Sequence, residues 1–361
     1  MYISSLILQN YRNYKNQIFE FSSGINIVSG SNAQGKTNAA EAIFFLCTGY
    51  SPRVTREKQV INYESDWAKI ECVAQSESMG KITAAIEFLA SGGKKITVNG
   101  MSALKTGELI GNINSVMFNP QQLKLVQESP DDRRRFMDIA LSQINRRYYY
   151  SLQKYKKILT QRNSLLKERD KDLIYQTLPA WDEQLVLCAS AIINDRNKFL
   201  KELKPLCESA HLTITGGSER LEISSESKYE GSQQQIAEQL YEQLSAKIEK
   251  DIEVGYTTVG PHRDDIKIKI NGQDARIYGS QGQQRTAALS LKIGEVNIFK
   301  NHFGEFPVLI LDDAMSELDQ SRRKCLLSLL DGVQTIITCT DAESLNITGG
   351  KTFKIQAGEI V

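Results

Sequence analysis

Apolar and polar residues alternate along much of the first 120 residues, a pattern typical of half-buried β-strands. Residues 1–8 alternate in this way and predict an edge strand. The short apolar run 25–28 predicts a strand, and the helix-compatible stretch 38–47 follows it. Residues 95–100 end in Asn-Gly, which favours a tight hairpin turn. The chain therefore begins as a β-rich region around one helix.

After residue 134 the apolar residues recur in steps of three and four, which predicts helices. The first run carries Tyr148, Leu152, Tyr155, Leu159 and Leu166. The second run carries Leu178, Trp181, Leu185, Cys188, Ile192 and Phe199. We expect a turn at 170–177, with Pro179 in the first turn of the second helix. The two helices would form an antiparallel arm, at most about 50 Å long at about 1.5 Å per residue.

Polar residues dominate 215–250, where we expect a loop and an amphipathic helix. Strand patterns return at 254–258 and at 266–270, the latter closed by an Asn-Gly turn. The last hundred residues alternate strands with helices, as in an α/β sheet. We therefore predict an α/β head formed by residues 1–125 and 250–361, with a mostly helical lobe, 126–249, inserted into it.

The segment 30–37 fits the phosphate-binding pattern G-x-x-x-x-G-K-[ST]. Glycines let backbone N–H groups turn toward phosphate oxygens, and the following helix N-terminus adds positive partial charge. Lys36 would reach the β- and γ-phosphates, and Thr37 would hold Mg²⁺. We expect an ATP site lined by Gly30, Ser31, Asn32, Ala33, Gln34, Gly35, Lys36, Thr37 and Asn38.

A second apolar run, 306–311, ends in two carboxylates, Asp312 and Asp313. In an open parallel sheet such acids stand at the edge where ligands bind. Asp312 would orient Mg²⁺ through its water shell, and Asp313 would activate the attacking water. A strand that ends in two solvated acids is the simpler interpretation of this run alone. The phosphate-binding pattern upstream favours the catalytic interpretation.

Two further segments resemble parts of the ABC-type ATPases. One is similar to the ABC signature loop and precedes a predicted helix, 287–300; it consists of Ser280, Gln281, Gly282, Gln283, Gln284 and Arg285. The other resembles the D-loop and consists of Ser316, Glu317, Leu318 and Asp319. In ABC ATPases the signature loop closes over the γ-phosphate bound to a second subunit. The resemblance therefore implies an ATP-dependent homodimer with two ATP molecules in its interface.

The amino-acid composition mainly argues against certain classes of protein and site. The chain is 41% hydrophobic and 24% charged, as in soluble globular proteins. No apolar run approaches the ~18 residues that a membrane span needs, and the first residues do not form a signal peptide. The six cysteines and three histidines are scattered, which argues against a zinc site and favours reduced thiols in a cytosol.

Positive charge is concentrated in one region although the net charge is only +1. Residues 133–172 hold twelve Lys/Arg and four Asp/Glu, an excess of eight positive charges. Such an excess can neutralise nucleic-acid phosphates, although a charged helix face is often merely solvated. The candidate DNA contacts are Arg133, Arg134, Arg135, Arg146, Arg147, Lys154, Lys156 and Lys157.

The segments 6–14, 130–138 and 260–265 resemble the RecF family of bacterial recombination-mediator ATPases, and the resemblance covers nearly the whole chain. It implies a cytoplasmic protein of DNA replication and recombinational repair. Such a protein would bind single-stranded DNA and single-strand/duplex junctions at gaps as an ATP-driven dimer, with weak, DNA-stimulated ATPase activity. The resemblance further implies RecR and, indirectly, RecO as partners, loading of RecA onto strands coated by single-strand-binding protein, and support of SOS induction.

The chain departs from the family pattern where Gln121 and Gln122 replace the usual acids. Gln122 could still act as a Q-loop ligand of the metal, which would place it with Lys36 and Asp313 in the catalytic set. The alternatives are a structural ATPase of the SMC type or another ABC-type ATPase that does not act on DNA. An SMC protein needs hundreds of residues of heptads, and a transporter subunit normally has a switch histidine near residue 340.

Overall fold

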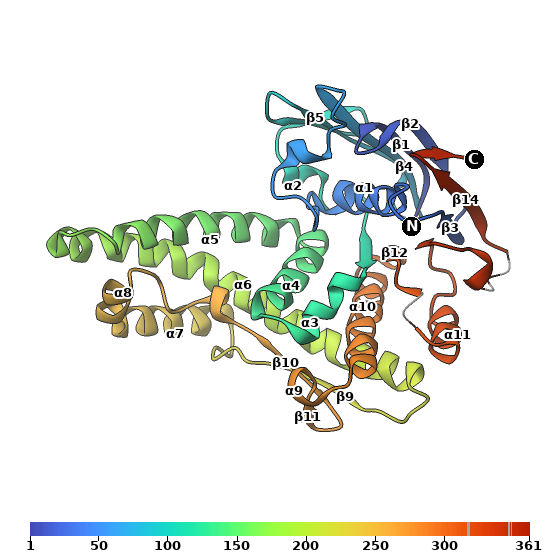
Figure 1. Ribbon diagram of the computed structural model, residues 1–361. Helices are drawn as coiled ribbons and strands as arrows, with labels where there is room; N and C mark the ends of the chain where they lie inside the picture. Colours follow the sequence, from blue (N-terminus) through green and yellow to red (C-terminus); the bar gives the residue numbers. More distant parts are fainter. Residues whose placement is uncertain (316–317, 346, 348) are drawn as a thin grey trace.

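The computed structural model describes residues 1–315, 318–345, 347 and 349–361. Two of the four expected D-loop residues, Ser316 and Glu317, lie outside these ranges. An α/β head is joined to a long helical arm that extends from it (Figure 1). None of the helices in the described ranges combines the length and apolar character that crossing a membrane requires.

The first sheet of the head is antiparallel, with the strand order β2-β1-β4-β5-β6-β7. Its strands are β1 (Tyr2–Tyr11), β2 (Tyr14–Glu20), β4 (Trp67–Ser76), β5 (Gly80–Leu89), β6 (Lys94–Val98) and β7 (Met101–Ala103). The predicted turn at Asn99-Gly100 is confirmed, with φ of 50° and 77° at its two residues. The prediction of an edge strand for residues 1–8 is wrong, because β1 pairs with both β2 and β4. Alternation reports which face of a strand is buried, and it carries no information on how many neighbours the strand has.

The second sheet carries the nucleotide-site candidates, and its strand order is β15-β14-β3-β13-β12-β8. Its members are β3 (Ile25–Ser29), β8 (Ser115–Phe118), β12 (Val308–Asp312), β13 (Thr335–Cys339), β14 (Lys351–Gln356) and β15 (Glu359–Ile360). All pairs are parallel except β14 with β15. Val308 and Ile310 pack into the core shared with α1 (Lys36–Thr48), whereas Leu309 and Leu311 pack into the core shared with α10 (Gln281–Phe303). Burial on both faces explains why this strand is a continuous apolar run.

The arm is formed by α5 (Arg146–Leu165) and α6 (Lys171–Ile214), which follow α4 (Pro130–Ile144). The predicted helical hairpin is confirmed, but the turn at 170–177 is wrong. Asp170 caps α6 by accepting a hydrogen bond from the N–H of Leu173, so the helix begins earlier and Pro179 lies inside it. The 44 residues of α6 span about 66 Å. That length exceeds the expected limit because α6 continues past α5 and packs along α10.

A small sheet with the strand order β11-β10-β9 lies in the chain between the arm and α10, the helix of the signature-like segment. Its strands are β9 (Leu221–Ser225), β10 (Ile266–Ile270) and β11 (Gln273–Asp274). Between β9 and β10 come α7 (Gln233–Ala246) and α8 (Ile248–Val254), so the prediction of a strand at 254–258 is wrong. β9 lies in the polar stretch where only loop and helix were expected. Its partner β10 is about 45 residues further along the chain, so the pairing leaves little local signal.

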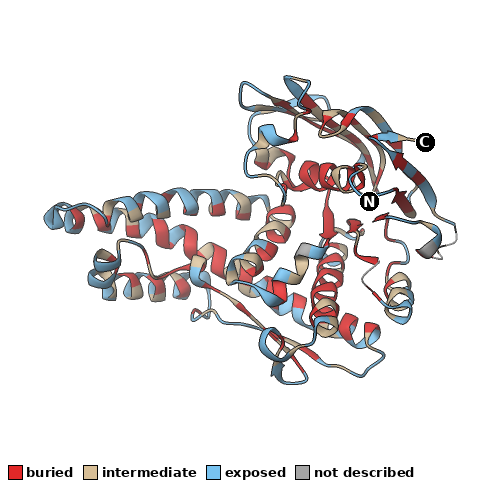
Figure 2. Ribbon diagram, viewed as in Figure 1, coloured by how far each residue is buried: buried red, intermediate tan, exposed pale blue. Residues whose placement is uncertain are grey.

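The remaining short elements connect these layers: η1 (Glu57–Val60), α2 (Thr106–Leu109), η2 (Pro120–Leu123), α3 (Lys124–Gln127), η3 (Pro261–Arg263), α9 (Ala275–Tyr278), α11 (Gln320–Ser328) and η5 (Glu343–Leu345). Figure 2 shows that burial is densest along α10, α1 and the strands beside them, whereas the arm exposes its outer face. The division of the chain at residues 125 and 250 stays a prediction, since α10 packs along α6.

Candidate nucleotide-binding site

The phosphate-binding loop connects β3 to α1, as the sequence pattern requires, and two of its glycines have no room for a side chain. Gly30 has φ of 152°, and a Cβ there would lie 2.4 Å from the carbonyl oxygen of Ile355. Gly35 has φ of 120°, and a Cβ there would lie 2.7 Å from Nδ2 of Asn13. These positions need glycine for both conformation and space.

Neighbouring turns hold this loop in shape. Nδ2 of Asn13 donates to the carbonyl of Gln34 at 2.7 Å, and the Tyr14 hydroxyl donates to the carbonyl of Gly35 at 3.0 Å. From the other end of the chain, the N–H of Ala357 donates to Oε1 of Gln34 at 2.6 Å. These supports were missed from the sequence, because they lie outside the loop, Asn13 and Tyr14 before β3 and Ala357 near the other end of the chain. The loop is thus preorganised by two turns of the head.

Three residues at the start of α1 connect the loop to its surroundings. Lys36 is buried, and its Nζ donates to the carbonyl of Ser31 at 3.0 Å across the loop. Nδ2 of Asn38 donates to Oδ1 of Asn13 at 2.8 Å. The Thr37 hydroxyl lies within hydrogen-bond reach of Asp312. The structure therefore places Thr37 beside Asp312, at the carboxyl edge of the parallel sheet that β3, β13 and β12 share.

The two acids after β12 occupy different environments. Asp312 is 4% exposed and accepts a hydrogen bond from the Thr338 hydroxyl at 2.7 Å. Burial raises the pKa of Asp312, and hydrogen bonds from Thr338 and Thr37 oppose this rise. Asp313 has φ of +52°, a left-handed conformation that is costly for a residue with a side chain. Asp313 directly follows β12, at the edge where ligands bind in parallel sheets.

A buried carboxylate beside the phosphate-binding loop, Glu41, was not among the site residues expected from the sequence. Glu41 is fully buried and accepts bidentate hydrogen bonds from Arg12, the shortest at 2.9 Å. Arg53 lies 3.5 Å from the same carboxylate and donates to Oδ1 of Asn38 at 2.9 Å. Arg12 comes from the β1–β2 turn, so only the fold could bring it to α1. The cluster places two guanidinium groups next to the phosphate-binding loop.

Gln122, the expected Q-loop residue, lies in η2 (Pro120–Leu123). Its side chain lines a cavity of about 250 Å³ together with Tyr50, Asp132 and Lys292. None of residues 30–38 lines this cavity. The role of Gln122 as a Q-loop ligand of the metal stays a prediction.

The signature-like segment forms the start of α10. Ser280 is the N-cap, accepting from the N–H of Gln283, and Oε1 of Gln283 accepts from the N–H of Ser280 in return. Gln281 is exposed. Gln284 is buried: its Nε2 donates to the carbonyl of Ala275 at 2.9 Å, and its Oε1 accepts from Gln127 at 2.8 Å. Gln284 therefore stabilises the loop from inside, and the expectation that it faces a nucleotide is revised.

The signature-like segment and the phosphate-binding loop belong to different parts of the molecule. α1, which begins at Lys36, lies in the upper part of Figure 1, and α9, which ends two residues before Ser280, lies at its lower end. In the D-loop segment, Leu318 is buried and Asp319 caps α11. The signature-like segment and the phosphate-binding loop therefore lie at separate places in one chain.

The three consecutive arginines of α4 have different surroundings. Arg133 is 5% exposed, and four of its five N–H donors are used by Asp265 and the carbonyls of Leu125 and Glu128. Arg134 is mostly buried and donates to the carbonyl of Asp264 at 2.6 Å. The guanidinium of Arg135 is half exposed and lies 5.7 Å from the centre of the Tyr50 ring. The expectation that Arg133 contacts DNA is revised, since its charge is neutralised within the fold.

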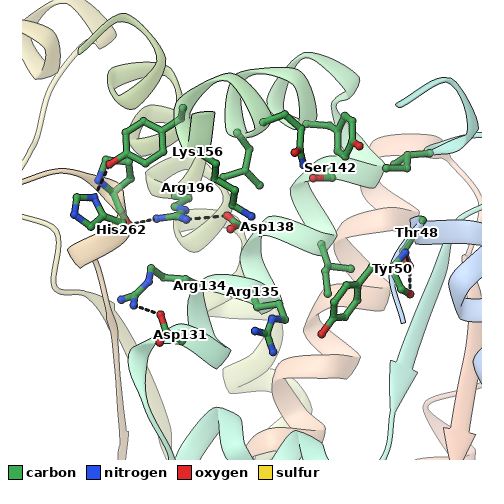
Figure 3. Close-up of a pocket in the computed structure, with 18 of the residues that line it drawn as sticks. Thr48, Tyr50, Asp131, Arg134, Arg135, Asp138, Ser142, Lys156, Arg196 and His262 are labelled. Atoms are coloured by element: carbon green, nitrogen blue, oxygen red, sulfur yellow. Dashed lines mark hydrogen bonds and ion pairs between the residues drawn. The ribbon is translucent and has the colours of Figure 1, made fainter. Parts of the chain in front are cut away.

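The basic residues of α5 remain on the surface. Arg146, Arg147, Lys154, Lys156 and Lys157 are all exposed. Lys156, together with Arg134 and Arg135, borders a cavity of about 410 Å³ between the head and the arm (Figure 3). This is the surface on which the predicted excess of positive charge is accessible to a ligand.

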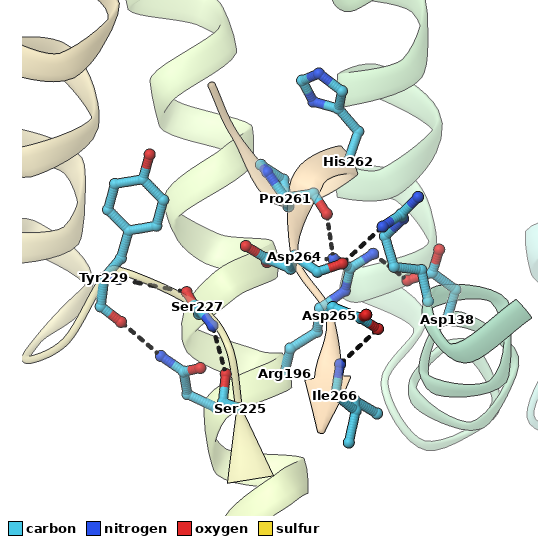
Figure 4. Close-up of polar contacts among 12 residues, drawn as sticks. Asp138, Arg196, Ser225, Ser227, Tyr229, Pro261, His262, Asp264, Asp265 and Ile266 are labelled. Carbon is cyan, nitrogen blue, oxygen red and sulfur yellow. Dashed lines mark hydrogen bonds and ion pairs between the residues drawn. The ribbon is translucent and has the colours of Figure 1, made fainter. Parts of the chain in front are cut away.

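The loop 260–265 forms hydrogen bonds with side chains of α5 and α6 (Figure 4). Arg196 is buried and bonds to Asp138 at 2.8 Å and to the carbonyl of Pro261 at 2.6 Å. His262 donates from Nε2 to the carbonyl of Thr257 at 3.0 Å, so its Nδ1 accepts from the Tyr155 hydroxyl at 2.5 Å. Burial lowers the pKa of His262 to about 4, which keeps the ring neutral near pH 7. The loop has a structural role.

Comparisons with known proteins agree over the whole chain. The family model described as RecF/RecN/SMC N terminal domain matches residues 2–358. A protein of Clostridium acetobutylicum named DNA replication and repair protein RecF is 42% identical over 363 residues, covering 100% of this chain and 99% of the relative. A protein of the same name from Acetivibrio thermocellus is 38% identical, covering 99% of each.

Solved structures of related proteins are similar to this chain along its whole length. A structure of the recombination mediator protein RecF-ATP in the RecFOR pathway has a TM-score of 0.90 and 36% identity, covering 100% of this chain and 97% of the other. A crystal structure of an SmcHead bound to the C-winged helix domain of ScpA has a TM-score of 0.61 and 14% identity, covering 100% and 97%. The second likeness shows the fold alone, an ABC-type ATPase head.

Proposed function

The chain belongs to the RecF family of DNA replication and repair recombination-mediator ATPases, and from this premise we propose that it is an ATP-driven, DNA-binding dimer. The observation that carries the proposal is the separation of two half-sites. Lys36, Thr37 and Asp312 assemble at one edge of the parallel sheet, whereas Ser280 caps a helix elsewhere. A second copy, related by a two-fold axis, would complete both sites at once.

In the proposed site, different residues of this chain bind the phosphates, hold the metal ion and activate water. Backbone N–H groups of the loop and the Lys36 ammonium hold the phosphates. The hydroxyl of Thr37 and the carboxylate of Asp312 are hard oxygen ligands of the kind that Mg²⁺ prefers, and they already lie together. Mg²⁺ would neutralise phosphate charge. Asp313 would accept the proton of the attacking water. The exposed signature residues Ser280 and Gln281, with the half-buried Gly282, would face the partner's γ-phosphate.

The DNA part of the proposal rests on α5. Its exposed lysines and arginines would neutralise phosphates of single-stranded DNA and of junctions at gaps, which releases counterions and makes binding salt-dependent. Weak ATP hydrolysis would then limit the time spent on DNA. The family relationship also supports RecR as a direct partner, RecO and RecA as indirect ones, and a cytoplasmic location. A structural SMC-type role is less consistent with an arm whose shorter helix has only 20 residues.

Sedimentation equilibrium tests the proposal. The protein is measured with ATP and Mg²⁺, with ADP and without nucleotide, each with and without gapped DNA. We expect a dimer only with ATP, and a shift toward the dimer when gapped DNA is added. A protein that stays monomeric with saturating ATP and Mg²⁺, with and without DNA, would refute the proposal.

A further inference from the structure

Two large apolar side chains protrude from α9, immediately before the signature-like segment. Ile277 is 69% exposed and Tyr278 is 68% exposed. A single exposed apolar residue is ordinary on a protein surface. Two neighbouring ones on a helix turn, separated from Ser280 by one glycine, form a small apolar projection beside a loop that is proposed to meet another molecule.

This projection is held rigidly to the signature-like segment. Asp274 caps α9 by accepting from the N–H of Arg276 at 2.9 Å. The Gln284 side chain, one helical turn into α10, donates to the carbonyl of Ala275. The turn between the two helices is tight, because a Cβ on Gly279 would lie 2.5 Å from that carbonyl oxygen. α9 and the start of α10 therefore move as one unit, and Tyr278 must accompany Ser280 wherever it docks.

We propose that Ile277 and Tyr278 are an apolar contact of the ATP-dependent dimer and pack against the second copy of this chain. The inference rests on the proposed function, since that function brings the signature-like segment onto the partner. The second copy is the expected partner of this projection because the projection adjoins the proposed dimer interface. When the second copy covers the signature-like segment, a rigid projection beside that segment is covered as well. DNA is a less suitable occupant, because α9 lies on the opposite side of α6 from the basic helix α5 (Figure 1).

The symmetry of the dimer sets the size of the expected effect. Each substitution removes a contact from both copies, so its effect counts twice in one dimer. Truncating the Ile277 and Tyr278 side chains of one copy should together weaken association about tenfold, because only a minority of interface side chains cost more than this when truncated. The double variant Ile277→Ala/Tyr278→Ala should therefore raise the dissociation constant of the ATP-bound dimer at least about 100-fold. Tyr278→Phe keeps the ring and should dimerise as the wild type does.

The experiment is sedimentation equilibrium with ATP and Mg²⁺ on the full chain. The matched control is Met101→Ala/Leu104→Ala, which removes a more exposed apolar pair, 73% and 91% exposed, at the edge of the antiparallel sheet. We expect the control to dimerise normally. At concentrations too low for dimerisation, both double variants should bind ATP with the wild-type affinity. Both should also melt at the wild-type temperature, because the substituted side chains are exposed.

The outcomes separate the two proposals. A wild type that does not dimerise with ATP refutes the proposed function itself. A wild type that dimerises while Ile277→Ala/Tyr278→Ala dimerises with equal affinity refutes only this surface. If the double variant dimerises normally but loses affinity for gapped DNA, the projection contacts DNA and the inference is also wrong.

Discussion

Replacing Arg133 should destabilise the fold, whereas replacing Arg135, two residues away, should mainly weaken DNA binding. The two side chains have the same chemistry and belong to the same turn of α4. Arg133 forms a bidentate pair with Asp265, at 2.6 and 2.8 Å, and this pair ties α4 to the start of β10. Arg135 has a half-exposed guanidinium 3.6 Å from Asp132.

The magnitudes follow from burial. Removing one partner of a buried ion pair costs about 3–5 kcal/mol, because the other charge is left without compensation. The Asp265 side chain is 18% exposed and still accepts from the N–H of Ile266, so we expect the lower end, about 3 kcal/mol, for Arg133→Ala. An exposed ion pair is worth about 0–1 kcal/mol. Arg135→Ala should therefore cost about 0.5 kcal/mol of the free energy of unfolding.

The assay is urea unfolding followed by tryptophan fluorescence, which reports on both parts of the molecule through Trp67 in the head and Trp181 in α6. The double variant Arg133→Ala/Asp265→Ala should be more stable than the sum of the two single losses predicts, by about 1–3 kcal/mol. Equal stability of Arg133→Ala and Arg135→Ala would show that the pair does not connect α4 to β10, and the structural interpretation of Arg133 would have to be abandoned.

Three further predictions concern catalysis, DNA binding and pH. Asp313→Asn should bind ATP and remain a dimer while hydrolysis falls at least about 100-fold; hydrolysis at the wild-type rate would remove Asp313 from the proposed mechanism. Alanine at Lys154, Lys156 and Lys157 should lower the slope of log affinity against log salt by about 0.7–0.9 per lost phosphate contact; an unchanged slope would assign α5 another purpose. Because the folded-state pKa of His262 is about 4, below the ordinary 6.5, its contribution to stability is present above pH 6.5 and is lost as the pH falls toward 4. The free energy of unfolding of the wild type should thus fall by up to about 3 kcal/mol more than that of His262→Phe over this range, and parallel curves in acid unfolding would contradict it.

Local spacing was sufficient to predict the phosphate-binding loop and the strand that ends in two acids. A phosphate-binding loop needs its glycines, lysine and threonine within eight consecutive residues, and a buried parallel strand is a continuous apolar run wherever both faces are covered. Hence Lys36, Thr37 and Asp312 could be proposed as site residues from their order alone, and the parallel pairing of β3, β13 and β12 places them at one sheet edge. The helical arm was recognisable for the same reason, since its period repeats within a few residues.

Partners that are distant in the chain were decided only by the tertiary structure. The run Arg133-Arg134-Arg135 does not predict which arginine pairs with Asp265. The sequence around Gln284 does not predict that its side chain donates to the carbonyl of Ala275. The same holds for Arg12 on Glu41, and for β1 lying between two strands. Whether a charged side chain is neutralised inside a protein or available to a ligand depends on which chain segments surround it, and folding, rather than composition or periodicity, brings those segments together.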